Sequence, residues 1–130
     1  MMNRTTAQRV RPQRAFGAPH VYVLAVIEGD NPHVVHRIQQ HETLVGRGAE
    51  ANFVIDDDEI SKLHCKIRSE ASVCTLQDLG SLNGTLLNGK PLRRGSSSRL
   101  RHLDEIQIGG TRLLLLTGRA IDRSKGSVPG

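Results

Sequence analysis

Short stretches of alternating apolar and polar residues recur along the chain at intervals of roughly ten residues. Each stretch is followed by residues that favour turns, chiefly glycine, proline, asparagine, aspartate and serine. No window has the three-to-four-residue apolar spacing of an amphipathic helix. The pattern predicts ten strands, over Val21–Glu28, Val34–Gln39, Thr43–Val45, Phe53–Ile55, His64–Arg68, Val73–Asp78, Thr85–Leu87, Ser98–Leu100, Glu105–Ile108 and Thr111–Thr117.

Two dipeptides between these runs, Asn88-Gly89 and Gly109-Gly110, are typical of two-residue hairpin turns. Asparagine and glycine adopt the positive φ angles that such turns require, so two hairpins are predicted. Many short strands, without helices to cover a parallel sheet, indicate an all-β fold built as an antiparallel β-sandwich. A closed barrel is the alternative architecture.

The net charge of +5 is unevenly distributed along the chain. Residues 21 to 118 contain 11 Lys and Arg against 12 Asp and Glu, whereas residues 1 to 20 contain four arginines and no acidic residue. Both ends lack periodicity, which predicts disordered tails at 1–20 and 119–130 around a single domain at 21–118. Because that domain is not basic and its few aromatic residues are scattered, nucleic acid is not an expected partner.

Several further classes of protein are disfavoured by what the sequence lacks. No stretch approaches the ~20 apolar residues of a membrane span, and no secretory signal is present, which favours a cytoplasmic protein without a membrane partner. Cys65 and Cys74 fall within predicted strands and are interpreted as core residues. The acidic run from Asp56 to Glu59 lacks the spacing of a calcium loop and is interpreted as a solvated turn, so no metal or other cofactor is expected.

Three motifs suggest nucleotide binding or catalysis, and each fails on its context. Residues 46–51 fit a dinucleotide fingerprint, but a strand follows instead of the helix that would bind the pyrophosphate. Residues 84–90 have P-loop spacing up to Lys90, yet Pro91 has no hydroxyl for magnesium. Ser61, His64 and Asp78 suggest a catalytic triad, but in a strand Ser61 and His64 would point to opposite faces. No enzymatic activity is expected.

Polar segments that folding alone does not explain lie where predicted strands meet loops. Loops at one end of a sandwich can bring such side chains together. An arginine fork, a serine hydroxyl, a lysine and an asparagine amide supply many hydrogen-bond donors and two positive charges. They indicate an oxyanion site built from Gly46-Arg47, Ser61-Lys62-Leu63-His64 and Leu79-Gly80-Ser81-Leu82-Asn83-Gly84-Thr85.

This ordered series resembles the forkhead-associated (FHA) domain family, whose pattern runs Gly-Arg, Ser-Arg-x-His, Asp-Leu-x-Ser-x-Asn-Gly-Thr and Asn-Gly. The last two elements correspond to residues 78–85 and to Asn88-Gly89, and the resemblance covers about residues 21 to 117. It implies an eleven-stranded β-sandwich that binds phosphothreonine peptides through loops at one end. One strand would then be missing from, or merged in, the ten predicted above.

The resemblance also implies a role for each matched residue. Arg47 and Ser61 would be the principal phosphate ligands, and Lys62 would be an auxiliary one. Asn83 would bind the backbone of the peptide through its side-chain amide. The supporting residues would be His64, buried behind the loop that presents Ser61, Gly46 and Gly84, which serve backbone geometry, and Thr85, packed inward.

Two positions depart from the family pattern. Lys62 stands where the family often has arginine or asparagine, which keeps a donor but loses the bidentate fork. Leu82 stands where many members have threonine or serine, so one hydrogen bond to the phosphate or the peptide is missing. Hydrogen bonds to charged groups each contribute roughly 1.5 to 3 kcal/mol, so binding is predicted to be weaker than in members with the hydroxyl.

The hypothesis that follows is a non-enzymatic adaptor that recognises phosphothreonine on a partner protein, downstream of a Ser/Thr kinase. One alternative is an FHA scaffold or dimerisation module that binds without phosphate. Another is the N-terminal regulatory domain of a longer signalling enzyme. A third is intramolecular, in which phosphorylated Thr5 or Thr6 docks in the domain's own site at a raised effective concentration.

Overall fold

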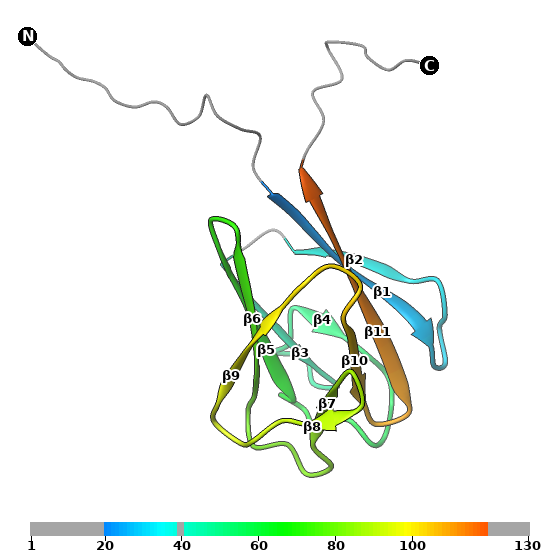
Figure 1. The fold of residues 1–130 in the computed structure, drawn as a ribbon. Coiled ribbons are helices and arrows are strands. Elements are labelled where there is room, and N and C mark those ends of the chain that lie inside the picture. Colours follow the sequence, from blue (N-terminus) through cyan, green and yellow to red (C-terminus); the bar gives the residue numbers. More distant parts are fainter. Residues whose placement is uncertain (1–19, 39–40, 120–130) are drawn as a thin grey trace, which may run out of the picture.

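The computed structural model describes residues 20–38 and 41–119 (Figure 1). These residues form strands and loops, and among them there is no helix that could cross a membrane. The eleven strands are β1 (His20–Glu28), β2 (Val35–Ile38), β3 (Glu42–Gly46), β4 (Phe53–Val54), β5 (Cys65–Glu70), β6 (Val73–Asp78), β7 (Thr85–Leu87), β8 (Lys90–Pro91), β9 (Ser97–Leu100), β10 (Glu105–Ile108) and β11 (Thr111–Arg119).

The strands form two sheets that enclose a common core (Figure 1). The six-stranded sheet has the order β2-β1-β11-β10-β7-β8, and the five-stranded sheet has the order β4-β3-β5-β6-β9. The paired strands are antiparallel except β3 and β4, which run parallel. The predicted all-β sandwich of eleven short strands is confirmed, with one parallel pair that the pattern did not predict.

The strand missed by the sequence pattern is β8. Two residues are too few to show alternation, and proline lacks an amide hydrogen, so such a strand fits only at a sheet edge, where β8 lies. It pairs with β7 across the predicted turn at Asn88 and Gly89, whose φ angles are 51° and 83°. The second predicted hairpin joins β10 to β11, and there Gly109 has a φ of 57°. Both predicted hairpins are therefore confirmed.

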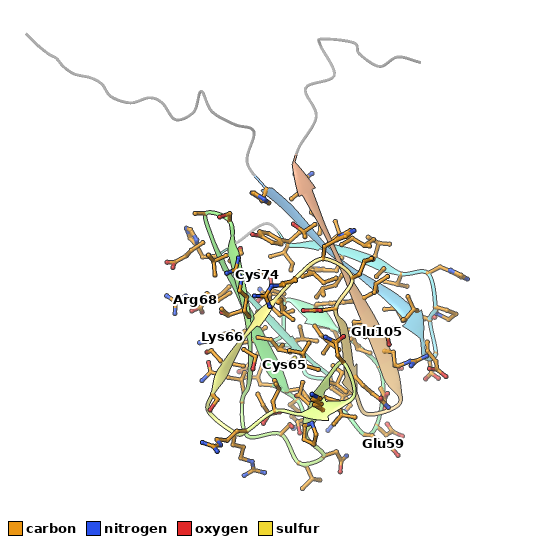
Figure 2. All side chains as sticks on the ribbon, in the orientation of Figure 1. Glu59, Cys65, Lys66, Arg68, Cys74 and Glu105 are labelled. Carbon is orange, nitrogen blue, oxygen red and sulfur yellow. The ribbon has the colours of Figure 1, made fainter. Side chains whose placement is uncertain are left out.

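The core lies between the sheets because alternate residues of each strand point inward. In β1, for example, Tyr22, Leu24 and Val26 are buried while the residues between them are partly exposed. Cys65 and Cys74, labelled in Figure 2, are buried free thiols, as predicted. Burial raises their pKa values to about 12 and about 11, so both thiols stay protonated and serve as apolar packing.

The two ends of the described domain lie together, opposite the loops that carry the predicted site. His20 in β1 pairs with Arg119 in β11, while the loops after β3 and β6 and the β10–β11 turn lie at the other end of the sheets (Figure 1). The strands thus extend one residue beyond each predicted boundary. Apart from His20 and Arg119, the predicted tails, with Thr5 and Thr6, fall outside the described residues, as does Gln39.

Candidate anion-binding site

Arg47 follows the last residue of β3 and is held by two hydrogen bonds. Its backbone amide donates to the Ser61 carbonyl (3.0 Å), and its side-chain Nε donates to the Ile60 carbonyl (2.9 Å). The Nε contact fixes the plane of the guanidinium, and the residue remains exposed. Arg47 therefore presents its terminal N–H groups in a fixed fork, the geometry that binds oxyanions well.

Gly46, at the end of β3, allows two loops to pack closely. A Cβ atom at this position would lie 2.0 Å from the carbonyl oxygen of Lys62 and 2.7 Å from its carbonyl carbon. Because the φ angle of Gly46 is not positive, the glycine is needed for space and not for its conformational range. Gly48 donates its amide to the same Lys62 carbonyl (3.0 Å), so the loop carrying Arg47 is tied to the loop carrying Ser61.

Ser61 lies in the loop before β5, with its hydroxyl oriented by a neighbouring loop. Ser61 Oγ accepts the amide of Leu82 (3.0 Å). A hydroxyl that accepts a hydrogen bond from an amide keeps its own proton for another acceptor. Lys62, the next residue, is exposed. Arg47, Ser61 and Lys62 thus combine two cationic groups and a hydroxyl donor on adjoining loops, a set that suits an anion.

His64 is fully buried behind these loops, with 0% of its surface exposed. Its Nδ1 accepts the Ser61 amide (3.0 Å), which requires Nδ1 to be without a proton. The hydrogen is then on Nε2, which donates to the Gly84 carbonyl (2.8 Å). The neutral ring therefore links the loop that presents Ser61 to the loop that carries Asn83.

The predicted strand over His64–Arg68 begins one residue later in the structure, and Ser61 does not lie in a strand. Residues 61–64 form a loop, because β5 begins only at Cys65, and the chain bends so that the His64 ring meets the Ser61 amide. The hydroxyl of Ser61 is hydrogen-bonded to Leu82 instead. The His64 ring therefore bonds to the Ser61 backbone and not to its hydroxyl, which is not the arrangement of a nucleophile and its base.

Asn83 is exposed on the loop between β6 and β7. Its side-chain Nδ2 donates to the carbonyl of Glu59 (2.9 Å), and Figure 2 shows Glu59 at the loop end of the domain. An asparagine amide has a second N–H and an acceptor oxygen. Asn83 is therefore placed at the same end as Arg47 and keeps hydrogen-bonding capacity for a ligand.

Two hollows adjoin these residues. One of about 360 Å³ is lined by Glu59, Asn83, Gly84, Leu86, Gln107 and Gly109. A second, of about 310 Å³, is lined by Gly48, Ala49, Glu50, Lys62 and Leu63. Side chains of an extended ligand that crosses the loops would find space in both.

Asp78, at the end of β6, organises the loop 79–84 from inside. Its carboxylate, only 3% exposed, accepts hydrogen bonds from Thr85 Oγ1 (2.7 Å), from Ser81 Oγ (2.6 Å) and from the amides of Gly80 (2.9 Å) and Ser81 (3.1 Å). Ser81 Oγ in turn accepts the amide of Gly84 (2.9 Å). Burial raises the pKa of Asp78, but these hydrogen bonds outweigh burial and hold the pKa below its ordinary value.

The sequence reasoning missed this supporting role of Asp78 and Ser81. The available signal was an aspartate followed three residues later by a serine, a spacing at which both side chains bond to nearby backbone in turns. Thr85 is 1% exposed and completes the cluster. The loop that carries Asn83 is therefore held by a buried carboxylate rather than by its glycines alone.

The interpretation of the acidic run at Asp56 to Glu59 as a solvated turn is wrong for Asp57. Its Oδ2 accepts hydrogen bonds from Thr111 Oγ1 (2.8 Å) and the Gly110 amide (2.9 Å), and its Oδ1 accepts the Glu59 amide (2.9 Å). Burial raises the pKa of Asp57, but these hydrogen bonds lower it by more than burial raises it. The pKa of Asp57 is therefore below its ordinary value. Asp57 therefore fastens the loop before Ser61 to the β10–β11 turn.

Replacing Asp57 with alanine is expected to lower the free energy of unfolding by about 2 kcal/mol, because the buried Thr111 hydroxyl and two backbone amides lose a charged acceptor. Asp56→Ala is the matched control, since Asp56 is the exposed neighbour, and its effect should stay within about 0.5 kcal/mol. Urea denaturation followed by circular dichroism measures both. Equal midpoints for the two variants would show that Asp57 contributes no more than a solvated carboxylate.

The loop end presents cationic side chains and hydrogen-bond donors. Within residues 20–38 and 41–119, no group of three or more His, Cys, Asp or Glu residues is arranged to hold a metal ion. The cations and donors of Arg47, Ser61 and Lys62 instead rest on a frame of buried hydrogen bonds. A rigid β-sandwich that carries polar loops at one end is typical of a binding domain.

The sequence pattern of the FHA domain matches residues 43–109, which include every residue of this site. The chain therefore belongs to the FHA domain family.

Relatives and solved structures agree with this assignment. The chain is 36% identical over 102 residues to the glycogen accumulation regulator GarA of Mycolicibacterium smegmatis, covering 78% of this chain and 63% of that protein. It is 35% identical over 108 residues to an oxoglutarate dehydrogenase inhibitor of Corynebacterium jeikeium, covering 82% and 73%. The FHA domain of MEK1, solved with a phosphothreonine peptide of HOP1, superposes with a TM-score of 0.62 at 33% identity, covering 76% of this chain and 96% of that one. The chain spans about two-thirds of the length of its curated relatives.

Proposed function

We propose that this domain binds phosphothreonine on a partner protein through Arg47, Ser61 and Lys62, and that it is a regulatory module without catalysis. One observation carries the proposal: the side chains of Arg47 and Ser61 are each fixed by one hydrogen bond that leaves their other donors for an anion. Donors held in place before binding lose little freedom when the phosphate arrives. Hydrogen bonds from cations to phosphate are also about twice as strong as neutral ones.

The rest of the loop end suits a peptide. Asn83 would bind the main chain beside the phosphorylated residue, and the two hollows would accept flanking side chains. The complex of the MEK1 FHA domain with a phosphothreonine peptide supports this class of ligand. The relatives named as a regulator and as an inhibitor support a regulatory role. In that role, a Ser/Thr kinase would create the ligand on the partner.

Arg47→Ala is expected to weaken binding of a phosphothreonine peptide by about 30- to 150-fold, equivalent to about 2 to 3 kcal/mol. The measurement is a calorimetric titration against a degenerate peptide library in phosphothreonine, phosphoserine and unphosphorylated forms. Arg68→Ala is the control, because Arg68 lies in β5 with its guanidinium 3.8 Å from Glu42. Parent-like binding by Arg47→Ala would remove Arg47 from the site.

The alternative of a phosphate-independent scaffold is separated by the same titration. Equal affinity for the phosphorylated and unphosphorylated libraries, or a complex with a partner that survives phosphatase treatment, would replace the proposal with the scaffold. Docking of phosphorylated Thr5 or Thr6 in the same site stays a prediction, because both residues lie outside the described part of the chain. The place of the domain in a longer enzyme also stays a prediction.

A further inference from the structure

Arg94 reaches the predicted phosphate site from a loop that the family motifs do not include. It lies between β8 and β9, and its Nη2 donates to the carbonyl of Ser81 (3.1 Å). The amide of the same peptide unit, on Leu82, donates to Ser61 Oγ (3.0 Å). This continuous chain of contacts places the Arg94 guanidinium within about 8.5 Å of the Ser61 hydroxyl, given standard backbone dimensions.

The stretch around Arg94 carries cations without acidic partners. From the first residue of β8 to the start of β10 it contains five cationic side chains, and within the described ranges none of them forms an ion pair. Three cations elsewhere in the domain do form ion pairs: Lys66 and Arg68 contact Glu42, and Arg112 contacts Glu28. The uncompensated set consists of Lys90, Arg93, Arg94, Arg99 and Arg101.

Leu82, whose amide contacts Ser61, has no side-chain group that could bind a charged ligand. Leu82 is 85% exposed, so a large apolar side chain stands on the surface where a hydroxyl would supply a donor. Arg94, which bonds to the neighbouring carbonyl, is the exposed cation that flanks this position. A guanidinium with one N–H engaged keeps several donors for an anion.

We propose that Arg94 binds a second acidic group on the phosphopeptide, either a carboxylate or a second phosphate. This inference rests on the proposed function of the site. An extended peptide advances about 3.3 Å per residue, so a distance of up to about 8.5 Å is spanned by two or three residues from the phosphothreonine. The domain therefore selects partners in which an acidic or phosphorylated residue stands two or three positions from the phosphothreonine.

A purely structural role for Arg94 makes a different prediction. If the guanidinium only braces the loop through the Ser81 carbonyl, its removal weakens every phosphopeptide alike, because that loop carries Asn83. If Arg94 binds a second acidic group, its removal affects only peptides that carry one. The contrast between neutral and acidic peptides therefore separates the two roles.

The test is a titration of the parent domain, Arg94→Ala and Arg101→Ala with phosphothreonine peptides of three kinds. The first has neutral flanking residues, the second has aspartate two or three residues away on either side, and the third has phosphoserine at those positions. Arg101→Ala is the matched control, because Arg101 follows the end of β9 that lies away from the site. The aspartate and phosphoserine peptides distinguish a carboxylate from a phosphate as the second group.

The parent is expected to bind at least one acidic peptide about fivefold more tightly than the neutral one, and the gain should fall as salt is added. Arg94→Ala should lose this gain and bind the neutral peptide within about twofold of the parent, while Arg101→Ala keeps the gain. No preference in the parent, or an equal loss for all peptides in Arg94→Ala, would overturn the proposed role of Arg94 but leave the proposed function of the site in place. Failure of the parent to bind any phosphopeptide would overturn the proposed function as well.

Discussion

A domain in which Gly46 is replaced by alanine is expected to bind phosphothreonine peptides at least about 100-fold more weakly than the parent, a loss of about 2.7 kcal/mol. The added Cβ would stand 2.0 Å from the Lys62 carbonyl oxygen, which is backbone and cannot rotate away. Relief of the clash requires the end of β3 to move from residues 62–63. That movement breaks the backbone contact of Arg47 with Ser61, so the two ligands no longer face the same phosphate.

The same substitution is expected to lower the free energy of unfolding by about 3 kcal/mol, as overpacking of a close contact does. Gly118→Ala provides the matched control, because Gly118 lies in β11, its φ is not positive, and a Cβ there meets no atom within 4 Å. That control should keep both stability and binding. Circular dichroism and peptide titration measure the pair, and parent-like binding by Gly46→Ala would show that the loops tolerate the movement.

Asp78→Ala is expected to have the largest effect on stability, lowering the free energy of unfolding by about 3 to 5 kcal/mol. The substitution removes a charged acceptor and leaves the hydroxyls of Ser81 and Thr85 without the partner that they have now. Asp58→Ala, on the exposed acidic loop, is the control and should change little. If the two variants unfold at the same urea concentration, the buried cluster does not hold the loop.

The pH dependence of stability tests the same cluster. The pKa of Asp78 in the folded domain is below its ordinary value of 3.8, so its carboxylate stabilises the fold above about pH 4. This contribution is lost as the pH falls through the lower, folded pKa, and Asp57 shifts in the same direction. The parent should lose stability steeply in this acid range, and Asp78→Asn should lose it less steeply. Equal slopes would contradict the role given to the Asp78 charge.

Strands with one buried face could be predicted from the sequence, and strands defined by their neighbours could not. The alternation in β1 follows from burial of Tyr22, Leu24 and Val26 on one side, and it is visible in the residues themselves. β8 contains only Lys90 and Pro91, which is too short for any periodicity. The parallel pairing of β3 with β4 depends on a contact between strands, which the composition of neither strand encodes.

In the candidate site, too, the residue types that bind an anion could be predicted from the sequence, whereas the contacts that position them could not. The order of the motifs was sufficient to nominate Arg47 and Ser61, because the residue types needed for an oxyanion are recognisable. The supporting contacts were out of reach, since Asp57 bonds to Thr111, 54 residues away in the chain. The bond between the His64 ring and the Ser61 amide depends on the bend of residues 61–64, which residue spacing does not encode. Spacing identifies donors, but the bends that orient them depend on the folded loops.

The pairing of His20 with Arg119 makes the domain suitable for grafting. Both ends of the described chain leave from one spot on adjacent strands, on the side away from the site loops (Figure 1). The domain can therefore be inserted into a surface loop of a carrier protein, or attached to a sensor chip by either end, with its loops facing outward. In such a device, the carrier would sit behind the sandwich and leave Arg47 accessible to a phosphorylated analyte.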